Sequence, residues 1–567
     1  MGFGVLDVRS SEHVPGTVFL NEAGRINLEL SLEVTATAAN GPSATTTLKH
    51  DKNIVLVPQP SNSPDDPLMW SKWRKLLFLV AFAYGCGCVG ADGPILAAAA
   101  VQLATEWEAS LSTFISQYNG VLLGCVAVSS LLGNSLAVKY GKRPVYLVTT
   151  VFLVAGSFWG AAAKSLGSLT ASRALVGLGV GPWEALIPAS IADLWFVHQR
   201  GFRLGIFNLA IFGGINIAAP ISGVIIERYG WRKCMYGISG AHLLQLILAF
   251  FFMPETAYHR AQTLNLDTAS SDDLSIPIPI PAKDPGAHHV EQTETKAAVT
   301  QGRDRDRDGY GSSYVPDTKV FPTLKQLSPW SGYYHPVSLY KITLRPARLL
   351  LSPIVSWCTI VFTTCVAWLV LIAVTISQIF SAPPYSFGVE QVGATNVSSF
   401  VASVVGVIVA QPLLDGLAVY MSKKNKGIYE PEFRLPLVLS YLLFSAVGFF
   451  AWGQSVHALD PWPVPVIVGL GLISFGVQLT TTAVAAYLVD SHRELSGEAF
   501  ALLGFVTKVF CMGLTFYITD WLVTAGIRNC FFTLGGITAA LGISALPMYV
   551  WGKRLRGWYH RKLAFHH

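Results

Sequence analysis

Twelve apolar runs dominate the sequence, and each is long enough to cross a lipid bilayer as a helix, which takes about 20 residues. Only 13% of the residues are charged and 52% are hydrophobic, whereas about 25% are charged in a typical soluble domain. This composition excludes an ordinary cytosolic enzyme, a collagenous fibre and a disordered regulator, and it predicts an all-α membrane protein. The runs lie near residues 76–101, 112–137, 144–163, 169–195, 202–226, 233–253, 350–380, 394–421, 435–453, 463–489, 498–523 and 529–551.

The gap between the sixth and seventh runs differs in composition from the rest of the chain. It holds four prolines between 277 and 285 and alternating Arg and Asp at 303–308. Such a segment buries too little apolar surface to offset the entropy lost on ordering. We therefore expect five parts: an N-terminal tail (1–75), a six-helix bundle (76–253), a largely disordered central loop (254–349), a second six-helix bundle (350–551) and a basic tail (552–567).

Lysine and arginine gather in alternate short loops, as the positive-inside rule describes for cytoplasmic segments. The loop at 228–233 departs from this pattern, but the balance predicts that both termini and the central loop are cytoplasmic. We expect the plasma membrane, with the vacuolar membrane as the alternative. Because the basic residues lie beside the apolar runs, topology explains the net charge of +6, and we expect no nucleic-acid partner.

Two short motifs recur at equivalent places in the two halves. Residues 134–143 follow the second run and parallel 415–424 after the eighth, while 230–234 before the sixth run parallel 526–530 before the twelfth. The repetition predicts two pseudo-symmetric six-helix bundles. Transporters built from such repeats bind their substrates between the halves, near the middle of the membrane.

Motifs for catalysis and metal binding are missing. The eight cysteines lie mostly in or beside apolar runs, where cysteine is usually a small core residue. The Cys86-x-Cys88 pair lacks a second pair at zinc spacing. The phosphate loop of ATP-driven pumps, the hydrolase elbow and the zinc-protease helix are all absent from the sequence. We expect no enzymatic activity, no metal and no cofactor, so that transport energy has to come from a gradient.

Several stretches resemble the major facilitator superfamily. Asn134-Ser-Leu-Ala-Val-Lys-Tyr-Gly-Lys-Arg143 is similar to the family loop Gly-x-Leu-x-Asp-Arg-x-Gly-Arg-Arg, with Val138 in place of the usual Asp. The sequence from Arg173 to Gly179 resembles the family pattern Arg-x-x-x-Gly-x-Gly, and Ala219-Pro-Ile-Ser-Gly223 is a partial exporter signature. Four further stretches, at 54–58, 66–75, 193–201 and 427–434, resemble a fungal branch of the twelve-span drug:proton antiporter group.

The resemblance implies a major facilitator fold with two pseudo-symmetric six-helix bundles. It implies a conformational gate at the loop residues that fit the motif, and proton coupling that involves Arg173. Because Val138 has no carboxylate, the resemblance does not extend to latching of the two halves through that position. The residues that fit the gate motif are Lys139, Gly141, Lys142 and Arg143.

Four of the charged residues within the apolar runs are the leading candidates for mechanism, because an ionisable group inside a membrane is costly and usually faces a cavity or a partner. At a rise of about 1.5 Å per residue, Asp92 and Arg173 both lie in the outer third of the membrane. We expect them to pair, with Asp92 accepting the coupling proton and Arg173 tuning its pKa. The alternatives are a fixed structural ion pair and an Asp92 at the outer mouth.

Glu184 and Lys508 lie at similar depths in opposite bundles, since Lys508 is about 12 Å from the inner end of its run at the same rise per residue. We expect one or both to line the central cavity. Glu184 would bind a cation or a proton, and Lys508 would orient an anionic substrate group or neutralise Glu184. The alternatives are that Glu184 bonds backbone groups freed by Pro182 and that Lys508 extends towards the membrane surface.

Neutral polar residues within the runs give weaker candidates for substrate contact, and each is at least as compatible with a bridge between helices. Those we single out are Gln117, Asn208, Gln378 and Gln478.

The sequence thus predicts a secondary active transporter that works by alternating access. Its most direct interpretation is proton-coupled export of a drug or fungal secondary metabolite. The rival is proton-coupled import of an organic cation such as a polyamine, and an alternative of another class is a non-transporting membrane receptor. The expected partners are a small-molecule substrate, protons and the lipid bilayer, and we expect a monomer.

Overall fold

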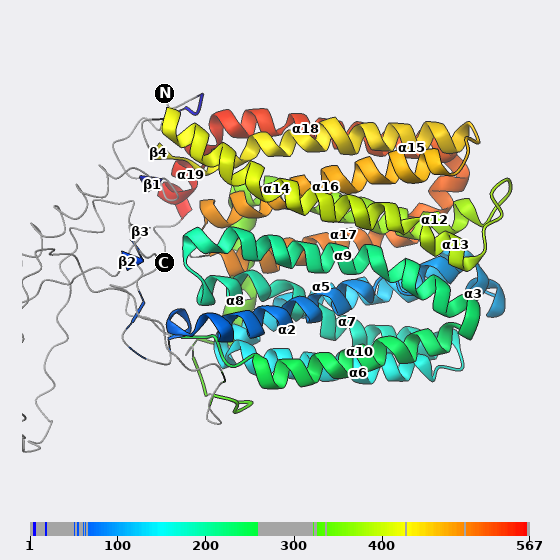
Figure 1. Ribbon diagram of the computed structural model, residues 1–567, viewed down its shortest axis with the longest axis horizontal. Coiled ribbons are helices and arrows are strands. Elements are labelled where there is room, and N and C mark those ends of the chain that lie inside the picture. Colours follow the sequence, from blue (N-terminus) through cyan, green and yellow to red (C-terminus); the bar gives the residue numbers. More distant parts are fainter. Residues whose placement is uncertain are drawn as a thin grey trace, which may run out of the picture.

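The computed structural model is a bundle of long, roughly parallel and antiparallel helices (Figure 1). The residues that it describes are 66–258, 337–425, 428–492 and 495–563, with short pieces of the N-terminal tail (4–6, 18–19, 50–51, 54–55, 60–61 and 63) and of the central loop (321, 326–330 and 332–334). Residues 259–320, on which most of the expected disordered loop falls, lie outside the described residues.

The first half of the bundle is built from α2 to α10. Its elements are η1 (Pro67–Met69), α2 (Lys72–Ala91), η2 (Ala97–Ala99), α3 (Ala100–Glu106), α4 (Leu111–Ile115), η3 (Ser116–Gly120), α5 (Val121–Tyr140), α6 (Lys142–Ala161), α7 (Leu166–Ala185), α8 (Ile187–Leu194), α9 (Val197–Tyr229) and α10 (Trp231–Phe252).

The second half is built from α11 to α19. Its elements are α11 (Leu339–Leu344), η5 (Arg345–Leu351), α12 (Pro353–Phe380), α13 (Val389–Ala394), α14 (Asn396–Lys424), η6 (Pro431–Leu439), η7 (Tyr441–Ala446), α15 (Val447–His457), η8 (Val464–Leu470), α16 (Gly471–Ser491), α17 (Ser496–Ala525), α18 (Ile527–Ile543) and α19 (Ala545–Leu563). Four two-residue strands, β1 (Val18–Phe19), β2 (His50–Asp51), β3 (Ile54–Val55) and β4 (Ile428–Tyr429), form two antiparallel pairs, β1–β4 and β2–β3.

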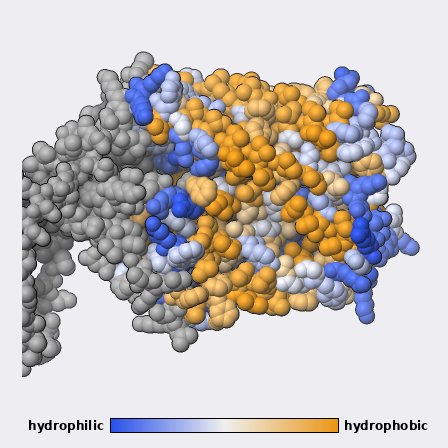
Figure 2. All heavy atoms as spheres, viewed as in Figure 1, coloured by the Kyte–Doolittle hydropathy of each residue, from blue (hydrophilic) through white to orange (hydrophobic). Residues whose placement is uncertain are grey.

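The expected membrane spans are confirmed. Among the described residues, 11 helical segments are long and apolar enough to cross a membrane, and α18 with α19, bent by 41°, makes a twelfth when the pair is counted as one span. Figure 2 shows hydrophobic residues around the middle of the bundle and hydrophilic ones at both ends. Exposed apolar side chains such as Val80, Ile221 and Ile408 are consistent with a surface that faces lipid rather than water. The exact division into tails, bundles and loop stays a prediction.

Local signals in the sequence explain where several spans begin and end. Ser71 caps α2, because its hydroxyl accepts a hydrogen bond from the backbone N–H of Arg74. Gly141, Gly230 and Gly526 each end one helix and start the next with a positive φ, at 94°, 86° and 78°. Glycine adopts this conformation without steric cost, so the chain can reverse within one residue. Gly230 and Gly526 do so at equivalent places in the two halves.

We call the end of the bundle where α2 begins and α19 ends the terminal side, and the opposite end the far side. The N-terminal segment lies against the second half on the terminal side: Leu6 donates a backbone hydrogen bond to the carbonyl of Val550 at 3.0 Å. Val5 packs in an apolar cluster with Met421 and Phe433, and Val18 of β1 pairs with Tyr429 of β4.

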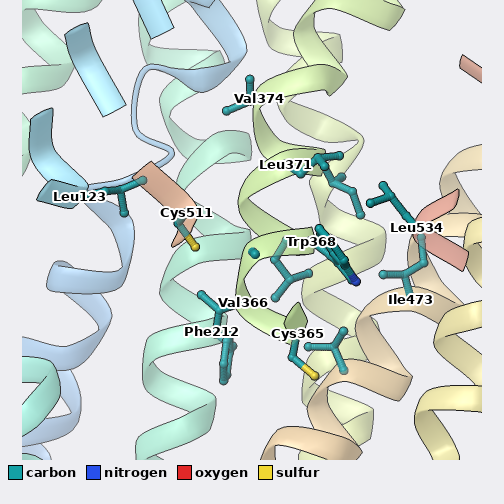
Figure 3. Close-up of a cluster of buried hydrophobic side chains, with 14 of the residues drawn as sticks. Leu123, Phe212, Cys365, Val366, Trp368, Leu371, Val374, Ile473, Cys511 and Leu534 are labelled. Atoms are coloured by element: carbon teal, nitrogen blue, oxygen red, sulfur yellow. The ribbon is translucent and has the colours of Figure 1, made fainter. Parts of the chain in front are cut away.

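One apolar core runs through both halves, and α12 lies at its centre. Figure 3 shows Phe212 of α9 beside Val366 of α12, with Trp368 and Leu371 further along the same helix. The two halves are therefore packed directly against each other in this conformation.

On the far side the two halves approach through glycines. Gly223 of α9 and Gly393 of α13 face each other so closely that a Cβ on Gly223 would lie 2.9 Å from the carbonyl oxygen of Val389. A Cβ on Gly393 would meet the carbonyl oxygen of Ala219 at still shorter range. The far side is closed between α9 and α13 because neither helix carries a side chain at this crossing.

We predict that Gly393→Ala lowers the midpoint of thermal unfolding of the purified protein. The added methyl group forces α9 and α13 apart, and overpacking of this kind typically costs about 1–3 kcal/mol. Gly416→Ala in α14 is the matched control, because nothing lies within 4 Å of the Cβ it would add. Alanine there should be neutral or slightly stabilising. Equal midpoints for the two variants would contradict the close crossing.

Candidate functional site

A cavity of about 70 Å³ lies between the two halves, about halfway along the spans. Small-molecule sites commonly have volumes of about 300–1,000 Å³, so the described conformation is a contracted one, and a substrate of that size enters only when the halves separate. The first half contributes α5, α7 and α9 to the walls, and the second contributes α12 and α17. The lining residues are Ser130, Glu184, Ala185, Phe207, Asn208, Ile211, Phe212, Ile215, Phe362, Val366, Phe500, Leu503, Gly504, Thr507 and Lys508.

Glu184 and Lys508 form an ion pair in this cavity. The Lys508 Nζ lies 3.0 Å from each carboxylate oxygen of Glu184, and the two side chains are 13% and 20% exposed. Glu184 lies in the last turn of α7, just after Pro182, where the span breaks between α7 and α8. Its carboxylate contacts Lys508 of the opposite half, whereas the local alternative had it bond to freed backbone groups of its own helix.

The walls around this pair are mostly apolar and aromatic. Phe207, Phe212, Phe362 and Phe500 line the same cavity. A low-dielectric environment strengthens the attraction between opposite charges and makes an unpaired charge costly. The cavity can therefore offer apolar contact to a substrate, together with one negative and one positive group that neutralise each other when it is empty.

A second charged cluster lies in the first half, around Asp92. This residue is 1% exposed and caps the C-terminal end of α2. Its Oδ1 atom lies 3.2 Å from Nε2 of His242 in α10. The Arg173 guanidinium donates to the backbone carbonyl of Asp92 and lies 4.3 Å from the ring centroid of Tyr118.

Asp92 and Arg173 are in contact, but the expected ion pair between their two side chains is not what the structure shows. The guanidinium bonds to the main chain of Asp92, and the carboxylate contacts His242. The physical reason is that α2 ends at Asp92, before Gly93 and Pro94, so its carbonyl is available to Arg173 while the side chain turns towards α10. Because both residues are buried, the alternative of an Asp92 open to the outer mouth does not describe this conformation.

Of the four neutral candidates, Asn208 lies in the cavity, where it is 4% exposed. Gln378 borders a separate cavity of about 310 Å³ within the second half, beside Pro383 and Pro384. Gln478 lies 3.5 Å from Thr482 one turn later in α16. Gln117 is half-buried in η3, outside the lining of the central cavity. Their roles in substrate contact stay predictions, but only Asn208 is brought together with Glu184 and Lys508.

The gate loop forms the tight turn between α5 and α6. Gly141 ends α5 with a φ of 94°. This geometry points the backbone N–H groups of Lys142 and Arg143 at Glu255, whose two carboxylate oxygens accept them at 3.0 Å each. Glu255 lies just after α10 and brings a carboxylate to this turn. The family motif would have a carboxylate at the position of Val138, near the end of α5.

The side chains of the gate loop hold the terminal side of the first half together. Lys142 bonds to Asp193 at 2.6 Å, and the carbonyl of Lys139 accepts a hydrogen bond from the backbone N–H of Tyr334 in the central loop at 2.8 Å. The Arg143 guanidinium, buried against α10 and the central loop, donates to four carbonyls. They belong to Phe250, Met253, Leu327 and Ser328. A gating role for these residues stays a prediction.

Sequence reasoning missed His242, Glu255 and a buried ionic cluster on the terminal side of the second half. In that cluster Arg556 of α19 bonds to Glu432 at 2.7 Å and to Glu430 at 3.0 Å. A signal existed for His242, because an ionisable ring inside an apolar run is as informative as a carboxylate. Glu255, Glu430, Glu432 and Arg556 lie beyond the ends of the apolar runs. Charged residues are common there, so their positions alone do not indicate a site.

His492 lies beside this cluster, in the loop between α16 and α17. Burial and the nearby Arg556 charge lower the pKa of His492 from its ordinary value of 6.5 to about 4. The unfolded chain therefore takes up a proton at a higher pH than the folded chain does. As a result, the contribution of His492 to stability is fully present above about pH 6.5 and is lost as the pH falls towards 4.

We predict that thermal stability falls between those two pH values and that His492→Gln reduces this fall. The reason is that the glutamine side chain takes up no proton in this pH range, so the unfolded variant is not stabilised by protonation at this position. The measurement is the unfolding midpoint as a function of pH in a fixed detergent. His457→Gln, at an exposed position at the end of α15, controls for the loss of a histidine as such. A pH dependence that His492→Gln leaves unchanged would contradict the assignment.

The membrane-spanning helices and the cavity between the two halves form the arrangement expected of a membrane transporter. A family model for the major facilitator superfamily matches residues 76–514. The chain belongs to this superfamily. Its membership favours transport over the receptor alternative and over an enzyme.

Relatives and solved structures agree with this family. An uncharacterized MFS-type transporter of Schizosaccharomyces pombe is 28% identical over 90% of this chain and 89% of its own length. The probable efflux pump mfs2 of Aspergillus flavus is 24% identical over 80% of this chain and 97% of its own length. The proton:xylose symporter XylE superposes with a TM-score of 0.55 at 14% identity, over 85% of this chain and 98% of that chain. At this identity the likeness shows the fold alone.

We predict that Glu184→Gln and Lys508→Met each destabilise the protein, because each leaves one charge unpaired in an apolar cavity. Removing one partner of a buried ion pair costs about 3–5 kcal/mol, and the residual exposure of these side chains should keep the loss at or below that range. The double variant should be more stable than the sum of the two losses predicts. Strictly additive shifts of the unfolding midpoint would argue against the pair.

Proposed function

We propose that this protein transports a small amphiphilic organic molecule through the central cavity by alternating access, in exchange for protons. The observation that carries the proposal is the Glu184–Lys508 pair, which joins the two halves across a cavity with otherwise mostly apolar walls. A substrate that brings its own charge replaces one partner of the pair, while its apolar part contacts the aromatic walls. Binding at this site therefore loosens the contact that has to open when the halves move.

The preferred direction is export of a drug or secondary metabolite. The probable efflux pump from Aspergillus flavus, which aligns over most of both chains, supports this direction. Proton antiport is the energy source that we propose, with Asp92 as the proton acceptor. The buried position of Asp92 supports this role, because an ionisable group kept from water inside a membrane usually has a function.

A second candidate is import of an organic cation driven by protons. The carboxylate of Glu184 favours it, because a cation can take the place of Lys508 beside that group. In both cases we propose a monomer with both termini in the cytoplasm, in the plasma membrane or the vacuolar membrane. The gathering of basic residues in loops of the terminal side supports this orientation.

The test begins with a comparison of metabolites in cells with and without the protein, inside the cell and in the medium. An exported substrate is depleted in the medium when the protein is absent, whereas an imported one remains there. The compound identified is then followed in vesicles that contain the purified protein under an imposed pH gradient. Flux that ignores the pH gradient would reject proton coupling.

We predict that Asp92→Asn abolishes the pH-driven part of this flux and leaves the amount of folded protein in the vesicles unchanged. Asparagine keeps the shape of the side chain and removes the group that ionises. Asp520→Asn is the matched control, since Asp520 is an exposed carboxylate near the far end of α17. Undiminished pH-driven flux in Asp92→Asn would reject the role of Asp92.

A further inference from the structure

The contacts of His242 offer a place for one exchangeable proton. Its ring is fully buried, and its two nitrogens face different partners. Nδ1 lies 3.0 Å from Oε1 of Gln245, and Nε2 lies 3.2 Å from Oδ1 of Asp92. An amide oxygen only accepts hydrogen bonds, so Nδ1 carries the hydrogen whenever Gln245 presents its oxygen to the ring, as it does in this arrangement.

A neutral imidazole has one N–H group, and here it is used at Nδ1. Nε2 would then present a lone pair to Asp92, and an ionised carboxylate also presents lone pairs. Two acceptors do not attract each other at 3.2 Å. The arrangement needs one more proton, held either as the second N–H of an imidazolium or as the O–H of a neutral Asp92.

We propose that Asp92 and His242 share one exchangeable proton and that together they form the proton-binding site of this transporter. The proton comes from water on the side to which the pair is exposed, binds between Oδ1 and Nε2, and leaves to water on the other side. The bond from the proton to a water oxygen breaks as its bond to Nε2 or Oδ1 forms, and nothing is oxidised or reduced. This assignment rests on the proposed function for its role in coupling, whereas the binding of the proton is a property of the pair alone.

The charged and titratable neighbours of the pair determine the net charge of the cluster. Arg173 from α7 is the charged neighbour, and Tyr118 of η3, Cys88 of α2 and Cys234 of α10 are the titratable ones. Tyrosine and cysteine ordinarily titrate near pH 10 and about 8.5 and so stay neutral when imidazole changes charge. With the proton the cluster carries one net positive charge, and without it the charges of Asp92 and Arg173 cancel.

Gln245 adapts to both states. When the proton leaves, its amide can turn so that the N–H₂ group donates to Nδ1, and His242 then donates from Nε2 to the ionised carboxylate. The Gln245 Nε2 atom has no partner within the described part of the chain and lies against Gly85 and Trp183. Turning the amide therefore breaks no other hydrogen bond. Gln245 is a positioning residue that stabilises either state of the pair.

The test counts the protons that the full-length protein binds in lipid nanodiscs, over the range in which imidazole titrates, roughly pH 5 to 8. Asp92→Asn and His242→Gln are each compared with the unchanged protein and with the double variant. Each single variant should bind one proton fewer, because each removes one of the two atoms between which the proton lies. The double variant should also bind only one fewer. A loss of two protons in the double variant, or of none in a single one, would overturn the inference.

His457→Gln is the matched control, because His457 is an exposed histidine at the end of α15, in the other half. The combination of His457→Gln with Asp92→Asn removes a histidine outside the pair, and a larger loss than that of Asp92→Asn alone shows that the count detects independent groups. Elution in size-exclusion chromatography checks that each variant is folded, and His242→Asn replaces His242→Gln if the latter elutes abnormally.

Gln245→Glu gives a second, independent readout. A carboxylate beside Nδ1 only accepts hydrogen bonds and adds a negative charge, so it should move the midpoint of the shared proton to higher pH. A merely structural role for Gln245 predicts no such movement, and an unmoved or lowered midpoint would contradict its positioning role.

The two proposals fail in different ways. If a pH gradient drives flux but the shared proton is missing, proton coupling stands and its site lies elsewhere. If the shared proton is found but flux ignores the pH gradient, coupling fails and the pair has no part in transport.

Discussion

The ion pair between Glu184 and Lys508 is the interaction on which the proposed mechanism depends. It lies where two requirements meet: a charge inside a membrane needs a partner, and the two halves of an alternating-access transporter need to move apart. By taking the partners from α7 and α17, the protein places this electrostatic contact on the surface that has to open. On the far side, Gly223 and Gly393 let α9 and α13 meet backbone to backbone, beside an exposed ion pair between Arg228 and Glu390.

The two charged clusters occupy separate places. Glu184 and Lys508 line the cavity, whereas Asp92, Arg173 and His242 are enclosed within the first half. In the mechanism that we propose, a substrate therefore need not touch the pair that binds the proton. The two clusters approach each other in space, because Gln245 lies against Gly85 of α2, as does Trp183, the residue before Glu184.

The sequence was sufficient for the fold, because twelve long apolar runs have few arrangements in a membrane, and glycines such as Gly230 set sharp boundaries. Depth along a helix can also be counted from the sequence, and it matches Glu184 with Lys508. The direction of a side chain around its helix cannot be counted in the same way. For this reason the sequence pairs Asp92 with Arg173 and not with His242, and it offers Gln117, Gln378 and Gln478 for substrate contact although they do not line the central cavity.

The attachment of the N-terminal segment has a practical consequence. Residues 4–6 lie on α19 of the second half, although the tail leads into α2 of the first. A fluorophore attached at residues 4–6 therefore reports the position of the second half. Energy transfer from it to a dye on the terminal-side end of α2 follows the separation of the halves, while transfer to a dye on α19 stays constant. The amino terminus thus provides a natural attachment point for watching single molecules change conformation.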